Sequence, residues 1–181
     1  DIEERLELFG RICEAVEYAH QKMVIHRDLK PSNIFVTGDG TPRLLDFGIA
    51  KLLDPDLAHD TLQPTATLLR MMTVDYASPD QVRGEKVTFA SDIYSLGVIL
   101  YELLIGYRPY VIASRAPHDV AKAICDDEPC LPSIAAVGQR EDLMPVRAES
   151  GTLTATEIAL RRRETPESLA EKLRGNLDNI I

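Results

Sequence analysis

Five polar side chains fall within eight residues of the chain, in the stretch VIHRDLKPSN (24–33), directly after two aliphatic residues. The set is His26, Arg27, Asp28, Lys30 and Asn33. A carboxylate two residues from a lysine can orient a hydroxyl group while the cation neutralises a phosphate oxygen. Any one of these residues alone is best explained as part of a solvated turn, so the remaining sequence must decide between a turn and a site.

A second polar cluster, DFG (46–48), lies thirteen residues after Asn33. Two short apolar runs around Gly38-Asp39-Gly40 separate the clusters, which predicts a strand, a tight turn and a second strand over 33–48. Such a hairpin brings Asn33 and Asp46 together at its open end, away from the turn. Their side chains offer oxygen ligands of the kind that Mg²⁺ takes when substrate phosphates complete its shell.

The elements that must position these clusters are mainly helical. Apolar residues at helical spacing predict an amphipathic helix over 2–19. The segment 90–105 is apolar on nearly every face and predicts a buried helix that stops at Gly106. A shorter helix is expected to start at Pro117, and another over 165–175 has threonine at its N-cap, proline at its first position and glycine at its stop.

The remaining segments lack sustained periodicity. Residues 49–76 predict a long loop, and loops of this length inside compact domains are usually functional or disordered. Residues 129–152 are predicted to be irregular, and the run Arg161-Arg162-Arg163 is interpreted as a solvated basic face. The expected fold class is therefore mainly α with a small β-ribbon.

Composition excludes several classes of protein. A chain of 181 residues, 45% hydrophobic, fits one domain with or without appendages and can bury a core. The net charge of −9 argues against a sequence-blind nucleic-acid binder, which needs a basic face. The most apolar run, 95–106, is too short to span a membrane and contains Glu102.

The number of cysteines indicates whether the protein belongs to a reducing or an oxidising compartment of the cell. The chain has three cysteines, an odd number and too few for a disulfide framework. No matching histidine or cysteine pair accompanies Cys125 and Cys130, so they are not expected to bind a metal. The sequence therefore predicts a soluble protein of a reducing compartment, the cytoplasm.

Four motifs in a fixed order carry a family resemblance. They are HRDLKPSN (26–33), DFG (46–48), YASPDQVRG (76–84) and SDIYSLGVILYELLIGYRPY (91–110). Together they resemble the catalytic loop, the metal-binding motif, the end of the activation segment and the central buried helix of the eukaryotic-type protein kinase family, in its C-terminal lobe. The resemblance runs continuously over residues 1–126, and the activation-segment motif is most similar to bacterial members.

The resemblance implies catalytic roles for particular residues. Asp28 resembles the base that positions the substrate hydroxyl, and Lys30 the lysine that contacts the transferred phosphate. Asn33 and Asp46 resemble the Mg²⁺ ligands, and Thr73 the threonine that bonds the catalytic aspartate and lysine. A lysine two residues after the aspartate is similar to Ser/Thr kinases rather than tyrosine kinases.

Further roles are implied around this centre. Phe35 resembles the apolar residue under the adenine of ATP. Asp92 resembles the helix carboxylate that holds the catalytic loop, which is compatible with its interpretation as an N-terminal helix carboxylate favoured by the dipole. Arg27 resembles the receptor for a phosphorylated loop residue, with three candidate threonines. These are Thr61, Thr65 and Thr67. Structural roles are implied for His26, Phe47, Gly48 and Asp80.

The resemblance also has departures. No Gly-rich loop, strand lysine or helix glutamate precedes the first helix, which implies that an N-terminal lobe is missing, that the lobe is truncated at both ends and that the chain alone is inactive. Asp80 stands where the family has glutamate. The expected organisation is a kinase core over 1–128, an irregular insertion over 129–164 and the start of late C-lobe helices over 165–181.

The sequence thus predicts a Ser/Thr protein kinase of bacterial signalling that transfers the γ-phosphoryl group of ATP to protein hydroxyls with Mg²⁺. Its partners would be a protein substrate and the missing N-terminal lobe. Two alternatives stay open: a pseudokinase-like scaffold that binds a partner without catalysis, and a small-molecule phosphotransferase. The latter would not be expected to carry YASPDQ followed by SDIYSLG.

Overall fold

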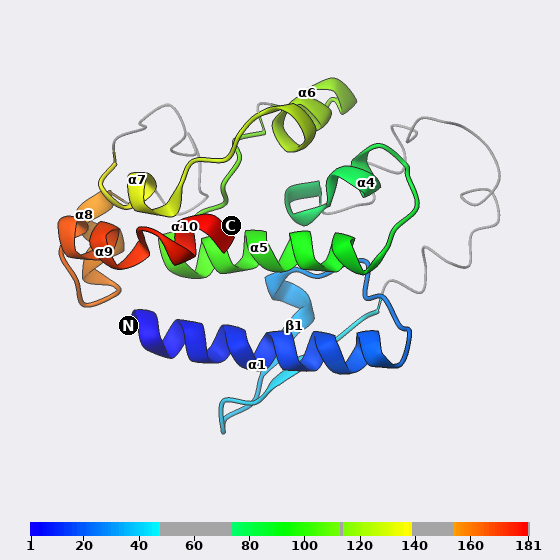
Figure 1. Cartoon of the computed structure of the whole chain (residues 1–181), viewed down its shortest axis with the longest axis horizontal. Helices are drawn as coiled ribbons and strands as arrows, with labels where there is room; N and C mark the ends of the chain where they lie inside the picture. Colours follow the sequence, from blue (N-terminus) through cyan, green and yellow to red (C-terminus); the bar gives the residue numbers. More distant parts are fainter. Residues whose placement is uncertain (48–73, 113, 139–153, 181) are drawn as a thin grey trace. The chain divides into compact units, whose positions relative to one another are not determined.

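The computed structural model describes residues 1–47, 74–112, 114–138 and 154–180 (Figure 1). The chain falls into two compact units. Unit 1 comprises residues 1–6, 97–111 and 128–181, and unit 2 comprises residues 7–96 and 112–127. The described elements are helical apart from a two-stranded sheet, as the sequence predicts.

Helix α1 (Ile2–Gln21) is amphipathic, which confirms the helix predicted over 2–19 and extends it by two residues. Its buried side chains recur at helical spacing: Ile2, Ile12, Val16 and Ala19. The opposite face carries exposed glutamates. Met23, with a φ of 58°, turns the chain after the helix.

The predicted hairpin is confirmed in unit 2. Strands β1 (Ile34–Val36) and β2 (Pro42–Leu44) pair antiparallel, with Ile34 opposite Leu44. Gly40 in the connecting turn has a φ of 79°, and its carbonyl accepts a hydrogen bond from Arg11 Nη1 at 3.2 Å. Glycine fits this position because the backbone is left-handed there.

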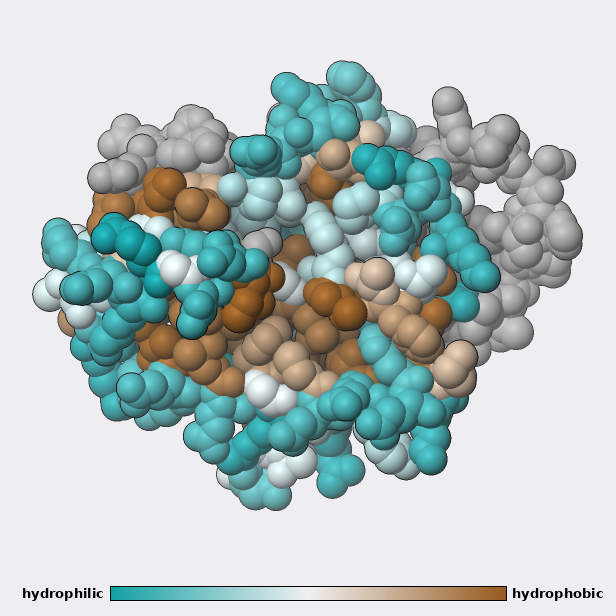
Figure 2. All heavy atoms as spheres, viewed as in Figure 1, coloured by the Kyte–Doolittle hydropathy of each residue, from teal (hydrophilic) through white to brown (hydrophobic). Residues whose placement is uncertain are grey.

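Helix α5 (Phe89–Ile105) confirms the buried helix predicted over 90–105. Its buried apolar residues lie on several faces: Leu96, Val98, Ile99, Leu100, Tyr101, Leu104 and Ile105. Apolar atoms gather across the middle of the face drawn in Figure 2, where α5 runs. Gly106, with a φ of 95°, ends the helix and donates its N–H to Glu102 at 2.8 Å. Among the described residues, no helix combines the length and the apolar character that crossing a membrane requires.

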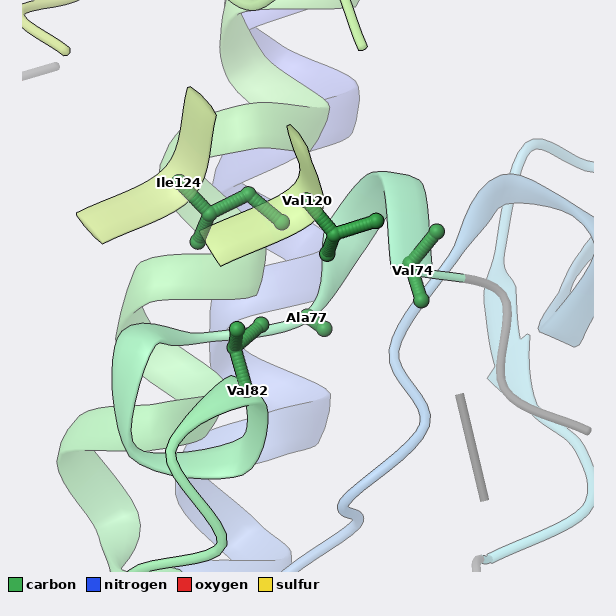
Figure 3. Packing of buried hydrophobic residues seen from close by; sticks show 5 residues of the cluster. All are labelled: Val74, Ala77, Val82, Val120 and Ile124. Carbon is green, nitrogen blue, oxygen red and sulfur yellow. The ribbon is translucent and has the colours of Figure 1, made fainter. Parts of the chain in front are cut away.

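Four short elements of unit 2 share a small apolar core. They are η3 (Val74–Tyr76), α4 (Pro79–Val82), α6 (Pro117–Ala121) and the π-helix η4 (Lys122–Asp126). Figure 3 shows the five buried side chains gathered where these elements meet: Val74, Ala77, Val82, Val120 and Ile124. The helix predicted to start at Pro117 is confirmed.

Four short helices in unit 1 correct one prediction. The segment 129–164, expected to be irregular, contains α7 (Pro132–Ala136) and α8 (Ala155–Leu160). Helices α9 (Pro166–Leu173) and α10 (Asn176–Ile180) follow, and both α7 and α8 pack against α9. A helix of five or six residues is too short to show a clear apolar period, which is why the pattern was missed.

The ends of these helices follow their local sequence. Thr154 and Glu157 form a capping box at the start of α8. Thr165 caps α9 by accepting the N–H of Ser168 at 3.2 Å, with proline at the first helical position, as predicted. Gly175, with a φ of 91°, follows the end of α9.

The basic run 161–163 is not a solvated face throughout, because Arg162 is buried with 2% exposure. Its guanidinium donates to three carbonyl oxygens: Leu104 O at 2.7 Å, Leu103 O at 3.2 Å and Ile158 O at 3.2 Å. Two of these lie in the last turn of α5, where the helix dipole favours a cation. Burial lowers the pKa of Arg162 to about 10, with Arg5 adding to the effect.

We predict that Arg162→Met lowers the free energy of unfolding by about 2–3 kcal/mol, because it keeps the apolar volume but leaves buried carbonyls without their charged donor. Urea denaturation measures the change. The exposed neighbour provides the control: Arg161→Met should change stability by no more than about 0.5 kcal/mol. Equal effects of the two substitutions would contradict a stabilising role for the buried guanidinium.

Candidate functional site

The buried carboxylate of Asp92, 1% exposed in the first turn of α5, holds the polar loop. Its Oδ2 accepts the backbone N–H of His26 at 2.8 Å, and its Oδ1 accepts that of Arg27 at 2.9 Å. His20 Nε2, from the end of α1, lies 2.8 Å from Oδ2. A buried charge is costly unless it is hydrogen-bonded. The contacts with His26, Arg27 and His20 provide the Asp92 carboxylate with the partners it needs.

Asp28 is the centre of the polar loop. Lys30 Nζ lies 2.9 Å from Asp28 Oδ2, and Asn33 Nδ2 donates to the same oxygen at 3.1 Å. Asn33 Nδ2 also donates to the backbone carbonyl of Asp28 at 2.9 Å. Asn33 is buried, whereas the side chains of Asp28 and Lys30 are about one-quarter and one-fifth exposed, at 24% and 20%. The three groups predicted to act together are thus brought together, with the carboxylate accessible from solvent.

His26 lies beneath the loop with no exposed surface. Its Nδ1 faces the N–H of Asp28 at 3.4 Å, and its Nε2 lies 3.0 Å from the carbonyl oxygen of Leu45. An acceptor at Nδ1 and a donor at Nε2 define the neutral imidazole. Burial lowers the pKa of His26, against the opposing effect of Asp92, and the ring packs on Phe47 with centroids 4.6 Å apart.

The end of the ribbon places Asn33 and Asp46 near one another. The N–H of Leu45 donates to the carbonyl of Asn33 at 2.8 Å, so Asp46 is the next residue beyond this bond. Asp46 has a φ of 50°, a left-handed conformation that aspartate tolerates better than most residues. Because the amide nitrogen of Asn33 is bonded to Asp28, its oxygen is the atom that remains to ligate. The donor set therefore fits a hard cation such as Mg²⁺.

The ribbon also presents an apolar surface beside this site. Phe35 on β1 is 55% exposed, and Val36 and Leu45 are 41% and 42% exposed. Among the described residues of unit 2, four other large apolar residues are exposed on α1, on α5 and in the turn after α1: Tyr18, Met23, Val24 and Ile93.

Asp80 in α4 connects the motif YASPDQVRG to α5. Its Oδ2 accepts the hydroxyl of Ser91 at 3.1 Å, and Ser91 Oγ accepts the N–H of Thr88 at 3.1 Å. Ser95, one turn later on α5, donates to the carbonyl of Tyr76 at 2.8 Å. The remaining candidates lie outside the described residues: Gly48, Thr61, Thr65, Thr67 and Thr73.

Sequence reasoning missed two residues that support the polar loop, one through Asp92 and one by direct contact. His20 contacts Asp92, and Gln81 donates through Nε2 to the carbonyl of Arg27 at 2.7 Å. The S-x-x-Q pattern of Ser78 and Gln81 signals a capping box, which the structure contains, but nothing local indicates the bond to the loop.

Comparison with known proteins defines the class to which this site belongs. A model of the protein kinase domain matches residues 2–150. The serine/threonine-protein kinase PknB of Mycobacterium leprae is 36% identical over 141 residues, which cover 78% of this chain and 22% of the relative. The probable serine/threonine-protein kinase PknB of Lactococcus lactis is 37% identical over 163 residues, 90% of this chain and 24% of the relative.

The chain belongs to the protein kinase domain family, as its motifs predicted. Its relatives among the bacterial PknB-type Ser/Thr kinases confirm that it is a bacterial-like member. The chain spans between about a fifth and a quarter of the length of the curated relatives it matches. The match also extends beyond residue 128, the boundary predicted for the kinase core.

We predict that His26 makes the protein less stable in mild acid. Because burial lowers the pKa of His26 in the folded state, the unfolded chain binds more protons below the ordinary histidine value of about 6.5, and stability falls as the pH falls through that value. Urea denaturation between pH 7.5 and 5 should show the wild type losing up to about 1.4 kcal/mol per pH unit more than His26→Gln.

The His26→Gln variant keeps a polar side chain at this position and cannot titrate. Since the two proteins share all other histidines, the difference between their stability curves reports on His26 alone. If the free energies of unfolding of the two proteins differed by a constant amount across this pH range, burial of His26 would not disfavour its protonation, and the prediction would be wrong.

Proposed function

We propose that this chain is the catalytic C-terminal lobe of a Ser/Thr protein kinase, which transfers the γ-phosphoryl group of ATP to serine or threonine hydroxyls of a protein. The observation that carries the proposal is the Asp28, Lys30 and Asn33 cluster, held by backbone bonds to buried Asp92. Phosphoryl transfer depends almost entirely on positioning and charge stabilisation, and this loop supplies both.

Asp28 would orient the attacking hydroxyl by accepting its hydrogen bond and then its proton. The contacts of Lys30 and Asn33 with Oδ2 restrict the rotation of the carboxylate, so that it is preorganised for this task. Lys30, 2.9 Å from the carboxylate, would place a positive charge beside the transferred phosphoryl group. Thr73 would add a further bond to this pair.

Asn33 and Asp46 would hold Mg²⁺ together with the nucleotide phosphates. Bound there, the ion would neutralise phosphate charge that develops during transfer. Two protein oxygens are too few to retain Mg²⁺ alone, because the ion prefers six ligands and loses water reluctantly. Metal binding is therefore expected only in the presence of the nucleotide.

Exposed Phe35 would lie under the adenine ring of ATP, and an N-terminal lobe would cover the apolar surface of the ribbon. The protein would act in the cytoplasm on a protein substrate. The presence of the aspartate, lysine, asparagine and second aspartate favours catalysis over a purely scaffolding role, since a scaffold needs none of the four.

We predict that Asp28→Asn and Asp46→Ala each abolish phosphotransfer by the complete gene product while leaving the fold intact, because one removes the base and the other a metal ligand. Incorporation of labelled phosphate into a protein substrate across a range of Mg²⁺ concentrations tests this. Asp39→Asn is the matched control in the exposed ribbon turn and should keep full activity. Near-normal activity of Asp46→Ala at all Mg²⁺ concentrations would refute the metal assignment.

We further propose that Arg27 binds a phosphorylated threonine in the segment between the motifs DFG (46–48) and YASPDQVRG (76–84). A doubly charged phosphate binds arginine through strong, charge-assisted hydrogen bonds and can order a loop. Replacing Thr61, Thr65 and Thr67 together by alanine should strongly lower the activity of the complete gene product, with the larger effect expected from Thr65 or Thr67. Unchanged specific activity, combined with unchanged phosphate content by mass spectrometry, would exclude these threonines.

A further inference from the structure

The side-chain amide of Gln81 joins two parts of unit 2 that are 54 residues apart in sequence. Its Nε2 donates to the carbonyl of Arg27 at 2.7 Å, and its Oε1 accepts the backbone N–H of Ser78 at 3.1 Å. A backbone N–H only donates and a carbonyl only accepts, so these partners fix the orientation of the amide. Gln81 is 7% exposed, which excludes most water from both bonds.

Arg27 is the residue whose conformation this bond restrains. Its φ of 69° is left-handed, a conformation that costs a non-glycine residue roughly 1–2 kcal/mol and persists only where the surroundings enforce it. Asp92 accepts the N–H of Arg27 at 2.9 Å, and Gln81 binds its carbonyl. The two backbone groups of Arg27 are thus held by different helices, the N–H by α5 and the carbonyl by α4.

The carbonyl of Arg27 belongs to the peptide bond that leads into Asp28. Because a peptide unit is planar, fixing that carbonyl also fixes the direction of the Asp28 N–H, which faces His26 Nδ1. The orientation of the Asp28 carboxylate therefore depends on the Gln81 bond as well as on its own contacts with Lys30 and Asn33.

Helix α4 provides Gln81 with a firm anchor. The capping box adds a bond from the Gln81 N–H to Ser78 Oγ at 3.4 Å, and Ser78 is 1% exposed. Ala77 and Val82, on either side of the capping box, belong to the apolar cluster drawn in Figure 3. Because α4 holds Gln81 in place, its side chain can restrain the Arg27 carbonyl instead of moving with the loop.

We infer that Gln81 is a positioning residue for phosphotransfer, which holds the catalytic aspartate through the Arg27 carbonyl and so ties the end of the activation segment to the catalytic loop. The inference rests on the proposed function. The residue does not touch the reacting groups, so its loss should lower kcat and leave KM for ATP unchanged.

The decisive variant is Gln81→Glu in the complete gene product. The introduced carboxylate keeps the acceptor for the Ser78 N–H and the size of the side chain, but it cannot donate to Arg27. We expect kcat at pH 8 to fall by about tenfold or more, the scale that misplacement of a catalytic group produces. Ser78→Ala is the matched control: it removes the capping hydroxyl and lowers stability, but it keeps the Ser78 backbone N–H and the Gln81 side chain, so the bond to Arg27 remains and kcat should be retained.

The pH profile separates positioning from a merely structural role. Burial next to a carbonyl raises the pKa of the introduced carboxyl group, and its protonated form can donate again. The ratio of variant to wild-type kcat should therefore rise as the pH falls from 8 to 6. Dividing by the wild type corrects for effects of pH that both proteins share. The charged and titratable groups nearby are Arg27, Asp28, Asp80, Asp92 and His26 around the loop, and His118, Asp119, Lys122 and Asp126 on the elements packed against α4.

Hydrogen exchange tests the inference without an activity assay. Backbone amides of residues 24–30, 32 and 33 should exchange about tenfold faster in Gln81→Glu than in the wild type or Ser78→Ala, because one restraint on the loop is lost. Unchanged exchange, or an unchanged kcat beside an inactive Asp28→Asn, would overturn the role of Gln81. A wild-type protein without phosphotransfer would overturn the proposed function, and the exchange rates alone would then decide whether Gln81 restrains the loop.

Discussion

The bonds from Asp92 to the backbone of His26 and Arg27 are the constraint on which the rest of unit 2 depends. Hydrogen bonds to a charged group contribute roughly 1.5–3 kcal/mol each, enough to offset the left-handed backbone of Arg27. They also lock the residues that precede Asp28, so the carboxylate, Lys30 and Asn33 meet without further adjustment.

Helix α5 has oppositely charged partners at its two ends. Asp92 lies in its first turn, and within unit 1 the guanidinium groups of Arg5 and Arg162 both donate to the carbonyl of Leu103 in its last turn. Each charge complements the local end of the helix dipole, and the two guanidinium groups also donate to carbonyls in the last turn that helix geometry leaves without a partner. Asp92, 1% exposed, and Arg162, 2% exposed, thus each lie where the backbone of the helix stabilises their charge.

The parts of this structure that could be predicted from sequence are those with a local physical signature. Helix α1 and helix α5 show clear periodicity, and the ribbon follows from a Gly-Asp-Gly turn between apolar runs. Arg162 and Gln81 could not be predicted, because a basic run and a helix cap describe nothing about the distant carbonyls that these side chains bind. Helices α7 and α8 were missed since their few residues leave no periodic pattern, although the capping box before α8 was present in the sequence.

The bonds between Asp92 and the polar loop join residues 65 and 66 positions apart in the chain. Such contacts form only after the intervening chain has closed on itself, so the loop should acquire its shape late, once α5 has packed. Closure entropy grows slowly with length, by about 0.6 kcal/mol for each doubling. The number of residues between the ribbon and η3 can therefore change with little effect on stability. Loss of the carboxylate at position 92, in contrast, would remove the bonds that hold the polar loop.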